Sequence, residues 1–317
     1  MTGIARLLVP TDFSSASDDA LAFAKRLAEP LGASLDVIHA FEDPFTTAAF
    51  AAEVYTPLPP SLREDLLREA DRRLAERLPV EQRVRFNGTS AIVPGPPARA
   101  IVDYAAQHGT DLIVLGTHGR TGAQHLLLGS VAERVIRTAP CPVLTVRQAP
   151  ERAIRTILVP TDFSESSDAA LEYAVRLAER LGASVQLLHV LDDPFLADGL
   201  AVEAYISEAP AVRTALLEDA RSRLANQPIP AHASALIVER EVLFGHGAST
   251  IAEYAGARAA DLIVMGTHGR SGLVHLLMGS IAERLVRTAP CPVLTVRQAA
   301  APSYFQELAY DIDHLPA

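Results

Sequence analysis

The sequence predicts an α/β fold made of two tandem domains, each an open parallel sheet flanked by helices. The first observation is a repeat at a constant offset of 150 residues: segment 8–14 recurs at 158–164, and 31 of the 39 positions in 111–149 are identical in 261–299. The second is that short apolar runs alternate with helical patterns, which indicates parallel strands joined by right-handed crossovers. We therefore expect domains at 1–149 and 152–299, followed by a tail at 300–317.

Each element of the first half follows from a local signal, and the second half repeats the pattern. Apolar runs of strand length predict strands at 6–10, 34–40, 111–115 and 142–147. A further strand has its clearest part at 91–93, and the pattern leaves open a start as early as Val84. Capping residues and apolar periodicity predict helices from Ser14 or Ser15 to Gly32, from a capping box at 61–64 to about residue 78, after Gly95, and at 131–137.

Composition excludes several classes of function. The net charge is −10 and the pI is near 5.5, whereas nucleic-acid binding without sequence preference requires clustered Lys and Arg. No apolar run approaches the length of a membrane span, and the first residues lack the apolar core of a secretory signal. Cys141 and Cys291 occupy equivalent positions, one per domain, which is not a disulfide framework. We expect a cytoplasmic protein.

A glycine-spaced loop follows the predicted strand at 111–115. It has the residues Gly116, Thr117, His118 and Gly119, then nine residues, then Gly129 and Ser130; the second half has Gly266, Thr267, His268 and Gly269, then nine residues, then Gly279 and Ser280. Glycines permit positive φ and close approach of a ligand to the main chain, and the start of a helix favours an anion. The spacing therefore predicts a phosphate site. The simpler interpretation is a set of tight turns with an N-capping Ser.

Two acidic residues directly follow the first strand of each half. Asp12 and Asp162 are as consistent with a capping or turn role as with a carboxylate that binds a ribose or base. His118 and His268 are equally consistent with a ligand contact and with a surface loop. The remaining candidates are expected to be packed or solvated: His39 and His189 near the ends of strands, and the acidic pairs at 42–43 and 192–193.

Both halves resemble the universal stress protein family, whose nucleotide-binding members carry the pattern G-x2-G-x9-G-[ST]. The matching segments are V-P-T-D-F-S, D-L-I-V-[LM]-G-T-H-G-R, L-L-[LM]-G-S-[VI]-A-E-R and A-P-C-P-V-L-T-V-R. The resemblance covers nearly the whole chain except the tail. It implies Rossmann-like domains of the adenine nucleotide alpha hydrolase type, each with a five-stranded parallel sheet of order 3-2-1-4-5. ATP would bind at the carboxyl edge, between the first and fourth strands.

The resemblance also implies the residues of two ATP sites, with Mg²⁺ held by the phosphates. In the first half, the base and ribose would contact Pro10, Thr11, Asp12 and Ala40, and the ribose and phosphates would contact Leu115, Gly116, His118, Gly119, Gly129, Ser130 and Val131. The second-half equivalents are Pro160, Thr161, Asp162, Val190, Met265, Gly266, His268, Gly269, Gly279, Ser280 and Ile281. His125 and His275 stand where the family often has a basic residue, so phosphate affinity is expected to weaken as pH rises past about 6.5.

The function that these expectations favour is nucleotide-dependent regulation in a stress response. The chain lacks the G-x4-G-K-[ST] loop of ATPases, so we expect at most slow ATP hydrolysis or self-phosphorylation. The alternative is a nucleotide-free scaffold. The resemblance also implies pairing of the domains through their final strands, so we expect these two strands to pair antiparallel within the chain, with further homodimerisation left open. The aromatic tail either docks on the protein or frays as a short helix.

Overall fold

The structure is a computed structural model that describes residues 4–42, 59–117, 128–147, 152–191, 209–230, 233, 236–267 and 278–297. The first half contains β1 (Arg6–Pro10), α1 (Ser15–Leu31), β2 (Ser34–Phe41), α3 (Pro60–Arg77), α4 (Val80–Arg85), β3 (Ser90–Pro94), α5 (Pro97–His108), β4 (Leu112–Gly116), α6 (Ser130–Thr138) and β5 (Val143–Val146). The order of strands and helices is the predicted one, apart from α4. The predicted tail at 300–317 lies outside the described residues.

The second half repeats this order. It contains β6 (Thr156–Pro160), α7 (Glu165–Leu181), β7 (Ser184–Leu191), α9 (Ala209–Asn226), β8 (Val238–Phe244), α10 (Gly247–Ala257), β9 (Leu262–Gly266), α11 (Ser280–Thr288) and β10 (Val293–Val296). The described residues between α9 and β8 contain no helix equivalent to α4. The duplicated sequence therefore encodes a duplicated fold, with a local difference before its third strand.

The predicted helix limits depend on capping residues, which the structure tests directly. Ser14 caps α1 by accepting a hydrogen bond from the amide of Ser17 (3.3 Å), and Gly32 ends the helix in the left-handed conformation with φ 59°. The capping box predicted at 61–64 is wrong, because α3 starts one residue earlier, with Pro60 at its first position and no side-chain cap. A third strand beginning at Val84 is also wrong, because that residue lies in α4.

All ten strands form one continuous sheet in the order β3-β2-β1-β4-β5-β10-β9-β6-β7-β8. Each half has the predicted order 3-2-1-4-5, and β5 pairs antiparallel with β10, which confirms the expected pairing of the final strands. Thr145 Oγ1 donates to the carbonyl oxygen of Val293 (3.0 Å), and Thr295 Oγ1 donates to that of Val143 (3.1 Å). This reciprocity indicates a pseudo-twofold axis between the two strands.

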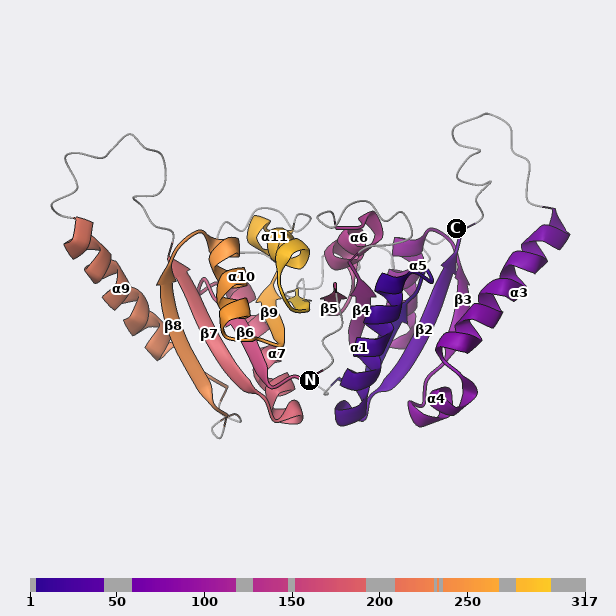
Figure 1. Cartoon of the computed structure of the whole chain (residues 1–317), viewed down its shortest axis with the longest axis horizontal. Helices are drawn as coiled ribbons and strands as arrows, with labels where there is room; N and C mark the ends of the chain where they lie inside the picture. The colour runs from indigo at the N-terminus through magenta and orange to yellow at the C-terminus, as the bar shows by residue number, and fades with distance from the viewer. Residues whose placement is uncertain are drawn as a thin grey trace, which may run out of the picture.

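Figure 1 shows how the sheet carries its helices. Helices α1 and α7 lie toward the centre of the molecule, α3 and α9 lie at its two ends, and α6 and α11 flank the midline at the top. One core, which includes Leu7, Val9 and Val37, lies beneath α1, α3, α7 and α9; the other, which includes Leu8 and Ile38, lies beneath α5, α6, α10 and α11. Adjacent strand residues therefore face opposite cores, as expected for a sheet covered on both faces.

Arginines tie the two halves together outside the sheet. Arg297 donates to the carbonyl of Arg137 at the end of α6 (2.9 Å), and Arg147 donates to the carbonyl of Arg287 at the end of α11 (3.3 Å). Arg180 of α7 also donates to the carbonyl of Ile4 (3.1 Å). Cations near the last carbonyls of a helix are favourable, so these contacts stabilise the junction between the halves.

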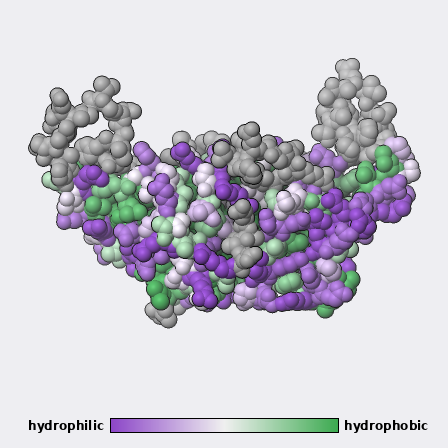
Figure 2. Space-filling model, in the orientation of Figure 1, coloured by the Kyte–Doolittle hydropathy of each residue, from purple (hydrophilic) through white to green (hydrophobic). Residues whose placement is uncertain are grey.

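The visible surface is mostly hydrophilic. Figure 2 shows hydrophobic side chains gathered beside the outer end of α3 and over the end of the molecule that carries α9 and β8. Large apolar side chains exposed on these two helices occupy equivalent positions: Leu62 and Leu66 on α3, and Val212 and Leu216 on α9. None of the described helices is long and apolar enough to cross a bilayer.

Candidate nucleotide cleft

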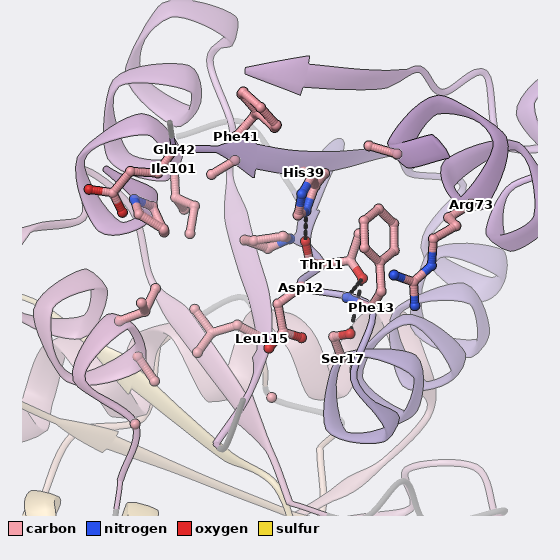
Figure 3. Close-up of a pocket in the computed structure, with 18 of the residues that line it drawn as sticks. Thr11, Asp12, Phe13, Ser17, His39, Phe41, Glu42, Arg73, Ile101 and Leu115 are labelled. Atoms are coloured by element: carbon pink, nitrogen blue, oxygen red, sulfur yellow. Dashed lines mark hydrogen bonds between the residues drawn. The ribbon is translucent and has the colours of Figure 1, made fainter. Parts of the chain in front are cut away.

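A cleft of about 690 Å³ opens at the carboxyl ends of β1, β2 and β4 in the first half. Loops that follow parallel strands meet at this edge, which is where open α/β sheets bind ligands. The residues that line it are Pro10, Thr11, Asp12, Phe13, Ser17, His39, Ala40, Phe41, Glu42, Leu66, Glu69, Ala70, Arg73, Pro97, Ile101, Leu115, Gly116, Thr117, Gly129, Ser130, Val131 and Ala132. Figure 3 shows several of them directed into the opening from β1, β2, α3 and α5.

Nine of the eleven residues expected for the first site lie around this single cleft. They are Pro10, Thr11, Asp12, Ala40, Leu115, Gly116, Gly129, Ser130 and Val131. The other two, His118 and Gly119, lie outside the described residues. Residues more than 100 positions apart in the chain, such as Pro10 and Gly129, thus border the same space.

The start of α6 forms one end of the cleft. Gly129 is its N-cap, with extended backbone (φ −63°, ψ 142°) and no side-chain cap, and Ser130 is the first helical residue. The interpretation of Ser130 as an N-cap is therefore wrong. The amide of Gly129 donates to the carbonyl of Thr117 (2.8 Å), which joins the two described ends of the loop. Unpaired amides in the first turn of a helix attract anions, so this end suits a phosphate.

Asp12 lies at the junction of β1 and α1. Its Oδ1 accepts hydrogen bonds from the amide (3.0 Å) and the hydroxyl (2.5 Å) of Ser14, and its side chain borders the cleft. The turn role and the cleft position, which the sequence left as alternatives, are thus combined in one side chain. One carboxylate oxygen is fixed by the turn, which orients the group as a whole.

Gly116 has a different structural reason from the one expected. It is absent from the residues with positive φ, and a Cβ atom there would lie 2.7 Å from the carbonyl oxygen of Ala16. Gly116 therefore does not use the positive φ that glycine permits. Glycine is required because the end of β4 packs closely against the first turn of α1. Gly266 makes the same approach to Ser166, where a Cβ atom would lie 2.8 Å from the backbone oxygen.

The second half places the equivalent residues on equivalent elements. Pro160 ends β6, Val190 lies in β7, Met265 and Gly266 end β9, and Gly279 caps α11, whose first residues are Ser280 and Ile281. Thr161 and Asp162 follow β6, and Asp162 Oδ1 accepts from the amide (3.1 Å) and the hydroxyl (2.5 Å) of Ser164. Gly279 donates to the carbonyl of Thr267 (2.8 Å). His268 and Gly269 lie outside the described residues.

Several lining residues were missed by sequence reasoning. Glu42, expected to be a solvated loop charge, lines the cleft near Ile101 (Figure 3). His39 is packed as expected, but it also borders the cleft. Phe13 and Arg73 of α3 had no assigned role. The repeat offers a signal for them, since Phe163, His189, Arg223 and Ile251 stand 150 residues after Phe13, His39, Arg73 and Ile101.

The described residues also bear on metals. Within those ranges, the side chains of His, Cys, Asp and Glu form no group of three or more that is arranged to hold a metal ion. The charged groups that border the cleft are Asp12, His39, Glu42, Glu69 and Arg73.

Comparison with known proteins now decides the family. The family model described as "Universal stress protein family" matches residues 3–147 and again residues 153–297. The chain belongs to the universal stress protein family. Among relatives, a universal stress protein of Mycolicibacterium smegmatis is 27% identical over 92% of this chain and 96% of its own length. Universal stress protein MJ0531 of Methanocaldococcus jannaschii is 37% identical over 47% of this chain and 85% of its own length.

A solved structure has the same tandem arrangement. The crystal structure of a universal stress protein from Archaeoglobus fulgidus superposes with a TM-score of 0.64, at 20% identity, over 92% of this chain and 98% of its own. At that identity the similarity concerns the fold. The architecture of two universal stress protein domains in one chain is therefore shared with a known structure.

Proposed function

We propose that this tandem universal stress protein binds ATP in both halves and that nucleotide occupancy serves a regulatory role in the stress response. The observation that carries the proposal is the cleft, which is lined both by the fixed carboxylate of Asp12 and by the uncapped first turn of α6. The same two features recur at Asp162 and α11.

The chemistry of the cleft suits a nucleotide. The first turn of α6 offers backbone amides and the positive end of the helix dipole to phosphate oxygens. The cleft also combines the Asp12 carboxylate with apolar side chains, among them Ala40, Ile101 and Leu115. A carboxylate accepts hydrogen bonds from ribose hydroxyls, and apolar walls suit a base. Mg²⁺ would be carried by the phosphates.

We further propose a cytoplasmic location and at most slow hydrolysis of the bound nucleotide. The free cysteines Cys141 and Cys291 support the location, because reducing compartments keep thiols unpaired. The low hydrolysis rate follows from the missing lysine loop of ATPases. Release of ADP from MgATP, measured against a buffer blank, tests this directly: a rate well above the blank would make the protein an ATPase.

The main experiment asks whether the purified protein contains or takes up adenine nucleotide. Denaturation followed by chromatography is expected to release ATP, and calorimetric titration of nucleotide-free protein with MgATP is expected to give two sites per chain. If no nucleotide is released and none binds, the proposal is wrong and the scaffold alternative is favoured.

Ser130→Asp separates loss of binding from loss of folding. Ser130 is exposed at the first position of α6, where a negative charge stabilises a helix by about 0.3–1 kcal/mol. The same charge repels a phosphate, so MgATP affinity is expected to fall about tenfold or more while the melting temperature is kept or raised. Ser280→Asp is the matched variant for the second half. Unchanged affinity in both variants would place the phosphates elsewhere.

A further inference from the structure

Phe13, the residue next to Asp12, has a backbone conformation that residues with a side chain rarely adopt. Its φ is 67°, and that of Phe163 at the equivalent position is 62°. The left-handed region disfavours a Cβ atom, so it persists only where surrounding contacts hold it. The same unfavourable conformation beside Asp12 and Asp162 indicates that these contacts serve a purpose at the cleft.

Side chains from distant elements contact the Phe13 ring, and two of them lie closer to its centre than Arg77 of α3, whose guanidinium carbon is 5.0 Å away. The guanidinium carbon of Arg73 in α3 lies 4.4 Å from the ring centre, and the imidazole centre of His39 in β2 lies 4.3 Å from it. Figure 3 shows the three side chains next to one another at one side of the cleft. We call them the first stack. Arginine above an aromatic ring is attracted by the negative charge of the ring face.

The second half contains the same arrangement. Arg223 lies 4.3 Å from the centre of the Phe163 ring, and the imidazole of His189 lies 4.5 Å from it. These three residues form the second stack. The surrounding residues differ, since Arg77 of α3 corresponds to Gln227. The stack has thus been kept while its neighbours changed.

Hydrogen bonds connect the first stack to the residues on both sides of Asp12. His39 Nδ1 lies 2.7 Å from the carbonyl oxygen of Thr11 and donates to it, because a carbonyl oxygen only accepts. The amide of Phe13 donates to Thr11 Oγ1 (3.0 Å). The backbone before and after Asp12 is therefore fixed. His189 Nδ1 makes the equivalent contact with the carbonyl of Thr161, also at 2.7 Å.

We infer that the stack of Arg73, Phe13 and His39 positions Asp12 for the nucleotide, and that the second stack positions Asp162. This inference rests on the proposed nucleotide function. Phe13 packs in the core beneath α1 and α3, whereas Ala132 of α6 packs in the core on the opposite face of the sheet. All three members of the first stack also border the cleft, and the hydrogen bonds of His39 and Phe13 described above hold the backbone on both sides of Asp12. The members of the stack are positioning residues.

The competing explanation is that the stack only holds α3 against the sheet. The two explanations differ in what happens to the turn at Asp12, where the amide of Ser14 donates to the Asp12 carboxylate. If the stack positions Asp12, weakening it loosens this turn before any nucleotide is added. If the stack only anchors α3, the turn is unaffected and overall stability falls.

The test compares Arg73→Met with the conservative Arg73→Lys and with the control Arg68→Met. Arg68 lies on the same helix, and its side chain is 75% exposed. Hydrogen–deuterium exchange of nucleotide-free full-length protein is expected to show faster exchange at the Ser14 amide in Arg73→Met. Exchange at the equivalent Ser164 amide should be unchanged. Arg73→Lys, which keeps a cation over the ring, is expected to restore most of the protection.

The second measurement is the MgATP affinity of the first site, made in the Ser280→Asp background so that the second site does not contribute. Arg73→Met is expected to weaken binding about two- to fivefold. Arg73→Lys and Arg68→Met should bind nearly as the parent does. A lowered melting temperature with unchanged exchange at Ser14 overturns the inference. Faster exchange with unchanged affinity overturns it as well.

Failure of the proposed function is recognised separately. It appears as absence of MgATP binding in the unmodified protein, before any variant is compared. A different result overturns only the positioning inference. If the unmodified protein binds MgATP, and Arg73→Met has the same Ser14 exchange and MgATP affinity as the control Arg68→Met, the positioning inference fails and the nucleotide function stands.

Discussion

The two halves share the backbone features of the proposed site and differ in the side chains around it. Both have a fixed Asp after the first strand and an uncapped helix start. In the second half Val190 replaces the smaller Ala40, and Met265 replaces Leu115, which has a similar volume. The comparison indicates that the main-chain geometry is kept at the proposed phosphate site, whereas side chains elsewhere in the proposed site vary.

A further difference between the halves, at the start of α6 and α11, is compensated by a neighbouring residue. Ile281 at the start of α11 is larger than Val131, and a Cβ atom on Gly247 would lie 2.8 Å from its Cδ1. The equivalent of Gly247 is Pro97, which lines the first cleft. The larger side chain of Ile281 on α11 thus fits because Gly247, at the start of α10, has no side chain.

The contact between α1 and α3, and its counterpart in the second half, shows a second exchange. Arg77 Nε lies 2.6 Å from Asp18 Oδ1 in the first half, whereas Gln227 Nε2 donates to Asp168 Oδ1 at 2.9 Å in the second. The carboxylate at this position is thus paired with a guanidinium in the first half and with a neutral amide in the second. A positive charge is therefore not required there, which argues that Arg77 supports the fold and does not bind phosphate.

The largest expected effect is on the reactivity of the two thiols, which should react equally slowly in the two halves. Burial raises the pKa of Cys141 and of Cys291 from 9.0 to about 12. At pH 8 the folded protein should therefore react with a disulfide reagent about a thousandfold more slowly than the unfolded chain, because the thiolate is the nucleophile. Stopped-flow measurement with and without denaturant checks this, and one fast thiol in the folded protein would break the equivalence of the halves.

The raised pKa values of the two thiols also make the free energy of unfolding depend on pH. The folded state keeps the thiol protons at pH values where the unfolded chain loses them. The stabilising contribution is therefore fully present below about pH 9 and is lost as the pH rises toward about 12. Unfolding midpoints measured across that range should fall with pH.

The next effect concerns the close approach of β4 to α1 and of β9 to α7. Gly116→Ala and Gly266→Ala are each expected to lower the free energy of unfolding by about 1–3 kcal/mol, because the added Cβ atom meets backbone atoms. The Cβ atom in Gly266→Ala also lies 2.2 Å from Ser166 Oγ, so the additional change Ser166→Ala should recover part of the loss.

Gly256→Ala is the matched control for these glycine substitutions. Gly256 lies in α10, and the nearest atom to an added Cβ is Pro290 Cγ at 3.9 Å. This variant should be no less stable than the parent, with a gain of up to about 0.5 kcal/mol. Urea unfolding measures all of the variants, and equal losses at Gly116 and Gly256 would contradict the packing explanation.

A smaller effect is expected where Tyr173 of α7 replaces Phe23 of α1. The Tyr173 hydroxyl is buried and has no hydrogen-bond partner among the described residues, and burial raises the pKa of Tyr173. Tyr173→Phe should therefore raise the free energy of unfolding by about 1 kcal/mol. Phe23→Tyr should lower it, since Phe23 is only 3% exposed. A loss on Tyr173→Phe in urea unfolding would show that the hydroxyl has a partner after all.

The smallest effect is expected for Arg77→Gln, which gives the first half the residue of the second. The Arg77–Asp18 pair is partly exposed, so its loss should cost less than about 1 kcal/mol, and the new amide can donate to Asp18 as Gln227 does to Asp168. MgATP affinity should be unchanged. A large drop in affinity would mean that Arg77 contributes to binding and that the clefts differ in mechanism.

Much of the fold follows from local patterns. The strand at 6–10 and the helix between Ser14 and Gly32 were predicted because an apolar run and two caps are encoded within a few residues. The third strand was harder. Val84 has the apolar character of a strand residue, but α4 forms there and leaves its side chain 77% exposed. Short apolar runs do not distinguish the two structures by themselves.

The candidate site likewise contains some residues that could be predicted from the sequence and others that could not. Strand ends and the Gly-Ser helix start could be placed from sequence, because loops after parallel strands meet at one edge. The contributions of Arg73 and Glu69 could not, since these residues lie on α3, a helix that carries charged residues at cleft-facing positions as well as at exposed ones. The structural role of Gly116 could not be predicted either, because the atom that excludes a side chain there belongs to Ala16, 100 residues earlier.

The sequence by itself determined the duplication, the order of strands and helices and the residues that end each strand near the cleft. Periodicity, caps and repeats are local properties, and they act before any distant contact forms. The tertiary structure alone decided the register of β5 and β10, with Leu144 opposite Leu294, the packing of Gly116 on α1, and the contacts of Arg73 and His39 with Phe13 beside Asp12. These features join residues far apart in the chain, so the packing of the whole domain has to bring them together.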